Sequence, residues 1–98
     1  MIKGTLSIPP DHPALAGHFP DDPVIPGVVL LDEAAEFISN KTGKEVRTLQ
    51  QARFKNPLAP GASCDLMLER IGAERAKVSA LLDGDTIFIA TFVIGDPT

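Results

Sequence analysis

The most constraining feature of the sequence is a run of prolines near its start. Residues 9–27 read PPDHPALAGHFPDDPVIPG and hold six of the nine prolines in the chain. Proline donates no amide hydrogen bond and disfavours helical geometry in the residue before it, so neither a helix nor a central strand fits this segment. We therefore expect a long loop. Apolar residues within it, such as Phe19 and Ile25, favour a loop that lies against the core.

A helical pattern follows this segment directly. From Gly27 to about Thr42 the apolar residues recur with helical spacing, with Pro26 just before and Gly43 just after. One face collects Leu30, Leu31, Ala34, Ala35, Phe37 and Ile38. The opposite face collects Asp32, Glu33, Glu36 and Asn40. The sequence thus predicts one long amphipathic helix with a buried side.

The rest of the chain has the alternation that is typical of β-strands. We expect strands over residues 2–8, 46–54, 63–71, 76–82 and 86–94. Asp83 and Gly84, between the last two, are a strong hairpin signal. One helix against a mostly antiparallel sheet is an α+β arrangement. We expect a single domain over residues 1–98, in which the sheet wraps the helix.

The small size of the chain indicates a dimer. A chain of 98 residues buries only about 60–65% of its unfolded surface, so it is marginally stable alone. A sheet that is covered on one face also keeps an exposed edge, and pairing two copies edge to edge would remove it. Both arguments predict a dimer with a continuous sheet.

The charge pattern excludes one class of partner and suggests another. A net charge of −4 and the absence of Trp and Tyr argue against a nucleic-acid binder. Basic residues are nevertheless concentrated over residues 41–55, where only Glu45 opposes them. They are Lys41, Lys44, Arg47, Arg53 and Lys55. Two interpretations remain open: a docking surface for an acidic partner, or a solvated helix end next to a strand edge.

Cysteine content and hydropathy indicate the compartment. Cys64 is the only cysteine, so no internal disulfide forms, and its apolar surroundings favour a small core residue. We find no signal peptide and no apolar stretch near the roughly 20 residues of a membrane span. The expectation is a cytoplasmic protein without a membrane partner.

The stretch GHFPDDPVIPGVVLLDEA, residues 17–34, holds the best candidates for chemistry. A neutral His18 in a stiff, apolar loop would be a usable base near neutral pH, and a histidine that only bonds a backbone carbonyl is the alternative. His12 lies among polar turn residues and is expected to be structural. No spacing of His, Cys and acidic residues suggests a metal site. No cofactor is expected.

A carboxylate and a backbone amide would complete such a site. Asp32 and Glu33 compete as the acid, and both fall on the polar side of the helix, where simple solvation is the alternative. Asp32 lies at the edge of that side, beside Val28, where partial burial would raise its pKa. The amide of Gly27 is a candidate oxyanion donor, although a Pro–Gly step also simply opens a helix. Base, acid and donor together fit proton abstraction beside a carbonyl with loss of a β-hydroxyl group.

The same stretch resembles the hallmark segment of the β-hydroxyacyl-(acyl carrier protein) dehydratases, which have the hotdog fold. ARFKNPLAPG (52–61) and ALLDGDTIFIATF (80–92) are similar to later blocks of that family, so the likeness covers about residues 5–94. The resemblance implies that His18 and Asp32, fourteen residues later, form the catalytic pair. It also implies that Gly27 polarises the thioester carbonyl and that the two active sites lie at a dimer interface.

Substrate and partner also follow from the resemblance. It implies an acyl chain carried as a thioester on an acidic acyl carrier protein, with Arg53 and Lys55 as docking residues. The residues expected to contact the substrate are Phe19, Pro26, Val28 and Leu31. The expected reaction is dehydration of a 3-hydroxyacyl thioester to the trans-2-enoyl thioester, in fatty-acid or polyene-type lipid synthesis. The alternatives are a hotdog thioesterase and a non-catalytic acyl-binding module.

Overall fold

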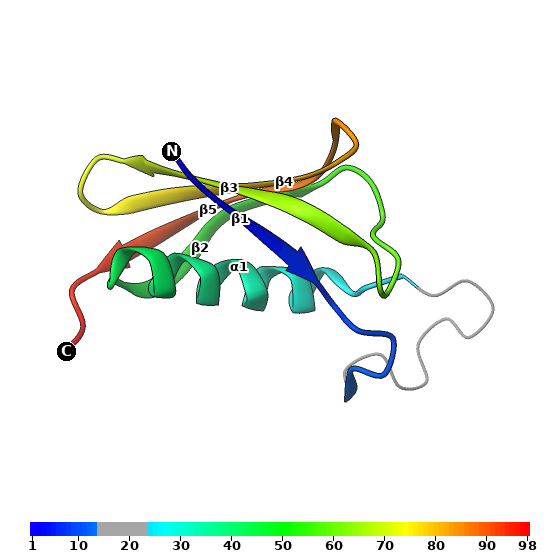
Figure 1. The fold of residues 1–98 in the computed structure, drawn as a ribbon. Helices are drawn as coiled ribbons and strands as arrows, with labels where there is room; N and C mark the ends of the chain where they lie inside the picture. Colours follow the sequence, from blue (N-terminus) through cyan, green and yellow to red (C-terminus); the bar gives the residue numbers. More distant parts are fainter. Residues whose placement is uncertain (14–23) are drawn as a thin grey trace.

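The fold is one helix laid against a five-stranded sheet. The computed structural model describes residues 1–13 and 24–98. Its elements, in chain order, are β1 (Ile2–Ser7), α1 (Gly27–Thr42), β2 (Glu45–Phe54), β3 (Ser63–Ile71), β4 (Arg75–Leu82) and β5 (Asp85–Gly95). Figure 1 shows α1 along one face of the sheet. The α+β arrangement, the helix and the five strands are therefore confirmed, with bounds that differ by about one residue. The loop expected over residues 9–27 lies largely outside the described residues.

The sheet is antiparallel throughout, in the order β1-β3-β4-β5-β2. β3, β4 and β5 follow one another as hairpins, and the two strands at the edges are β1 and β2. The register of β2 against β5 shifts between Val46 and Thr48 and again between Leu49 and Gln51. Such bulges bend a strand and increase its twist. The longer edge strand therefore curves around the side of α1.

The core lies between α1 and the inner face of the sheet. Rows of paired residues cross the central strands, for example Leu66–Ala80–Phe88 and Leu68–Val78–Ala90. All six of these residues are buried, and Leu30, Ala34 and Ile38 of the helix pack onto them. Because side chains alternate along a strand, the intervening residues point to the other face of the sheet. No element of the described ranges covers that face in Figure 1.

Glycine is required at two positions of the sheet, one in a hairpin turn and one where a strand approaches the helix. Asp83 and Gly84 both have positive φ, 52° and 86°, as a type I′ hairpin turn requires, so the predicted turn is confirmed. Gly4 of β1 lies against the ring of Phe37, whose Cε1 occupies the space that an added Cβ would need. A residue without a side chain at this position therefore allows β1 to approach the helix closely.

Candidate active site

The site begins where α1 begins. Pro26 caps the helix with its carbonyl, which accepts hydrogen bonds from the amides of Val29 (3.0 Å) and Leu30 (3.4 Å). Within the described residues, the amides of Gly27 and Val28 have no hydrogen-bond acceptor. The helix dipole adds positive potential at this end. Two unpartnered donors therefore lie at the amino terminus of α1.

A cleft of about 540 Å³ opens beside these amides. Its lining residues are Ile25, Gly27, Leu30, Phe54, Lys55, Asn56, Pro57 and Leu58. Ile25, Leu30 and Leu58 are each at most 3% exposed and form an apolar floor. Lys55, Asn56 and Pro57 are exposed. A cleft with an apolar floor and a polar rim suits a ligand with an apolar tail and a polar head.

Two hydrogen bonds between backbone segments hold the walls of the cleft together. The amide of Ile25 donates to the carbonyl of Leu58 at 3.0 Å, which ties the segment before α1 to the loop after β2. The amide of Lys55 donates to the carbonyl of Ile87 at 2.8 Å, which ties the same loop to β5. The side chain of Asn56 adds a bond of 2.6 Å to the carbonyl of Thr86. The cleft is thus built on fixed backbone.

Phe54 lines the cleft next to the start of the helix. It is the last residue of β2 and is 50% exposed. Its ring packs on the buried ring of Phe88, with centroids 6.1 Å apart and a tilt of 41°. Its Cζ is 2.8 Å from the position that a Cβ on Gly27 would occupy. Only glycine at this helix position fits against the ring as it lies.

The proposed acid lies on the open side of the helix. Asp32 is exposed, on the side of α1 that faces away from the core. The expected partial burial is therefore wrong for the chain by itself, because no described segment covers this side. Glu33, the competing carboxylate, is half-buried. It lines a separate hollow of about 170 Å³, together with Thr5 of β1 and Phe37 of α1. The two carboxylates thus point toward different surroundings. His18 and Phe19 lie outside the described residues.

The residues that line the cleft differ from those expected to contact substrate. Pro26, Val28 and Leu31 are not among its lining, and Val28 is 65% exposed. Phe54, Leu30 and Leu58 line the cleft without having been expected to contact substrate. Phe54 and Leu58 lie within the family-like block ARFKNPLAPG, and Leu30 lies on the apolar face of the helix, so both patterns carried a signal for them. Their convergence on Gly27 depends on the pairing of β2 with β5.

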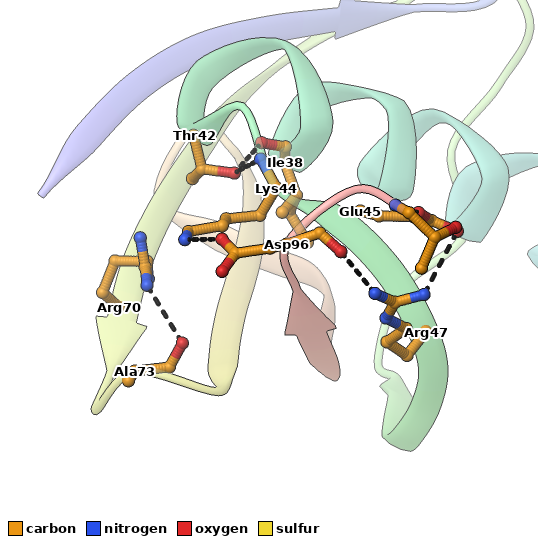
Figure 2. Close-up of polar contacts among 9 residues, drawn as sticks. Ile38, Thr42, Lys44, Glu45, Arg47, Arg70, Ala73 and Asp96 are labelled. Carbon is orange, nitrogen blue, oxygen red and sulfur yellow. Dashed lines mark hydrogen bonds and ion pairs between the residues drawn. The ribbon is translucent and has the colours of Figure 1, made fainter.

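The concentrated basic residues separate into two groups, shown in part in Figure 2. Lys44 forms an ion pair and hydrogen bond with the carboxylate of Asp96, and Arg47 donates to the carbonyl of Asp96. This pairing holds the pKa of Asp96 below its usual value, first through the hydrogen bond from Lys44 and then through its charge. Arg53 and Lys55 are exposed and have no ion pair within the described residues. Lys41 is likewise exposed and without an ion pair among these residues, so Lys41, Arg53 and Lys55 are left to meet an acidic partner.

Other chemistries find little support in the described part of the chain. It holds no group of three or more His, Cys, Asp or Glu side chains that would suit a metal ion. Cys64 is buried, as expected, and its burial, together with the charge of Asp65, raises the pKa of its thiol. The thiol is therefore neutral and inaccessible as a nucleophile. No helix among these residues has the length and apolar character to cross a membrane.

Comparison with solved structures identifies the fold. One chain of the dehydratase heterocomplex ApeI:P from Xenorhabdus doucetiae matches with a TM-score of 0.81 and 22% identity, over 95% of this chain and 85% of that one. An uncharacterized protein from Erwinia carotovora subsp. atroseptica matches with a TM-score of 0.77 and 25% identity, over 96% and 82% of the two chains. The helix and sheet are thus shared with these proteins.

Comparison of sequences identifies the family. The 3-hydroxyacyl-[acyl-carrier-protein] dehydratase FabZ of Actinobacillus succinogenes is 31% identical over 96 residues, which is 88% of this chain and 63% of that protein. The FabZ of Klebsiella pneumoniae subsp. pneumoniae is 29% identical over 108 residues, or 95% and 72%. The chain thus spans about two thirds of the length of these relatives. The profile of the ApeI-like family, described as ApeI dehydratase, matches residues 1–87, so this chain belongs to the ApeI-like family of hotdog dehydratases.

Proposed function

We propose that this protein dehydrates a 3-hydroxyacyl thioester, carried on an acyl carrier protein, to the trans-2-enoyl thioester. The observation that carries the proposal is the unpartnered amide of Gly27 at the start of α1, beside an apolar cleft. A thioester carbonyl accepts a hydrogen bond from such an amide, and the acyl chain finds apolar surface next to it. The FabZ relatives act on the same class of substrate by name.

The reaction assigns one role to each of three groups. Gly27 donates its N–H to the carbonyl oxygen, which stabilises the negative charge that develops when the α-proton leaves. His18 takes that proton as the general base. Asp32, in its protonated form, gives a proton to the departing β-hydroxyl, which leaves as water. A double bond forms between the α- and β-carbons, and the proton taken by His18 returns to Asp32 to close the cycle.

A second copy of the chain would supply the shielding that Asp32 lacks. The edge strand β2 carries Leu49 and Phe54, which are 42% and 50% exposed, and Val28 lies 65% exposed at the start of α1. Exposed apolar residues beside a free strand edge are typical of a surface that another chain covers. We propose that β2 pairs with β2 of a second copy and that each site combines His18 of one subunit with Asp32 of the other.

The carrier protein would dock on Arg53 and Lys55. Lys55 is exposed on the rim of the cleft, and Arg53 is exposed two residues earlier on β2. An acidic carrier protein is attracted by such charges, and its prosthetic arm reaches the cleft from the rim. We also propose that this protein is soluble and cytoplasmic, where it would meet such a carrier protein.

The proposed function is tested with 3-hydroxyacyl carrier protein as substrate and mass spectrometry to detect the loss of water. We expect turnover by the natural chain and a loss of about 100-fold to 10,000-fold in His18→Ala and in Asp32→Asn, the range for a general base or acid. His12→Ala serves as the matched control and retains activity. Full activity in both site variants would refute the assignment. Release of a free acid without loss of water would favour the thioesterase alternative.

The shared site is tested by mixing the two inactive variants. Subunits of His18→Ala and Asp32→Asn are unfolded together, refolded and assayed. A mixed dimer then holds one site in which both residues are intact, so activity returns. If His18 and Asp32 of a single chain formed the site, the mixture would stay as inactive as its components.

A further inference from the structure

We propose that Phe54 determines the length of acyl chain that the cleft accepts. This inference rests on the proposed function, because it concerns the same cleft and the same substrate class.

The ring lies beside the proposed donor in the cleft that it shares with the apolar floor. Its outer edge touches Gly27, and its face packs obliquely on Phe88 beneath it. An acyl chain whose carbonyl is bound at the amide of Gly27 therefore lies next to Phe54 in the cleft that Leu30 and Leu58 also line. The side chain at position 54 sets how much room remains in that cleft.

Phe54 also differs from the other apolar residues of the cleft because it can be substituted with less effect on the core. Ile25, Leu30 and Leu58 are at most 3% exposed and belong to the core, so their packing is fixed by many neighbours. Phe54 is half exposed in the single chain, where it ends the edge strand β2 that the second copy proposed above would cover. A different side chain here alters the cleft without opening a cavity in the core.

The size of the effect follows from the hydrophobic contribution of each methylene. A methylene group that gains a buried place raises the affinity for the chain about fourfold. Removal of the ring by Phe54→Ala or its partial removal by Phe54→Leu should therefore move the preference toward longer chains. Phe54→Trp fills more of the cleft and should move the preference toward shorter ones.

The experiment compares kcat/KM over a homologous series of straight-chain 3-hydroxyacyl carrier proteins. We expect the best substrate to lengthen in Phe54→Ala, with about a fourfold relative gain for each methylene beyond the natural optimum. Phe54→Leu gives an intermediate shift and replaces the alanine variant if that one does not fold. Ile71→Ala is the matched control, since Ile71 is an exposed apolar residue at the opposite end of the sheet, paired with Arg75. It should leave the ranking unchanged.

A binding measurement separates this inference from the proposed reaction. Calorimetric titration of the same variants with straight-chain fatty acids reports chain length without any turnover. A shift of the preferred length in the Phe54 variants, with no dehydration by any of them, supports the role of Phe54 and refutes the proposed function. Dehydration with the same length ranking in all Phe54 variants refutes the role of Phe54 and leaves the function standing. Absence of both binding and turnover overturns both.

Discussion

The two ends of α1 are built in opposite ways. At the carboxyl end, Gly43 adopts φ +71° and its amide donates to the carbonyl of Ser39 at 3.0 Å. The hydroxyl of Thr42 donates to the carbonyl of Ile38 at 2.7 Å and accepts from the amide of Lys44 at 3.1 Å. Figure 2 shows this end tied to the tail of the chain through Asp96. The groups named here meet partners from their own chain.

The amino end lacks such closure. Pro26 has no side-chain acceptor for the first amides, and no acidic residue stands in the first turn. Either device would satisfy the donors that a helix leaves open at its start. Their absence costs some helix stability and keeps the amide of Gly27 available. The difference suggests that one end of α1 serves the fold and the other serves a ligand.

Among changes that test the contrast between the two ends of α1, the largest effect should come from Gly27→Ala. A methyl group here pushes against the ring of Phe54 and keeps the carbonyl away from the amide, so we expect turnover to fall about 100-fold. Stability should change little, because alanine is the better helix former and the ring is half exposed. Steady-state assays and thermal unfolding measure the two effects separately. Normal turnover in this variant would mean that the amino end has no catalytic role.

A matched change at the other end should act on stability alone. Gly43→Ala forces a side chain into the left-handed region and is expected to cost about 1 kcal/mol. For a domain of this size the melting temperature should fall by about 4–8 °C. No atom lies within 4 Å of the added Cβ, so the cost is in the backbone and not in packing. Turnover per folded molecule stays unchanged. A loss of turnover comparable to that of Gly27→Ala would erase the contrast between the ends.

The smallest effect concerns pH and the Asp96 contact. Because Lys44 lowers the pKa of Asp96 in the fold, the ionised carboxylate stabilises the native state. This contribution is complete above the ordinary pKa of 3.8 and is lost as the pH falls through the lowered value. Asp96→Asn should remove that dependence, so its unfolding curve in urea approaches that of the natural chain only at acid pH. Asp85→Asn, an exposed turn carboxylate, is the control, and an equal change in both variants would contradict the assignment.

The helix and strands were predictable because their signals are local. Pro26 and Gly43 mark the ends of α1 in the sequence, and the turn at Asp83 and Gly84 is set by two residues with positive φ. Strand alternation similarly predicts which side chains enter the core. Such features depend on neighbours along the chain, which a sequence displays directly.

The cleft was only partly predictable because it depends on distant contacts. Gly27 was identified as a donor, but its contact with Phe54 requires the pairing of β2 with β5. The separation of the basic residues likewise depends on Asp96, which lies 52 positions after Lys44. The exposure of Asp32 follows its place on the helical wheel, and its shielding by a second copy stays a proposal. Its relation to His18 stays a prediction.

The unequal lengths of the two edge strands have a consequence for assembly. A dimer joined through β2 would have β1 of each copy as its outer edges, because β1 ends the sheet on the other side. β1 has six residues against the ten of β2 and carries Lys3. A short edge that bears a lysine is a poor template for another strand. Polymerisation by edge pairing would therefore stop at two chains, because neither outer edge of the continuous sheet would accept a further strand.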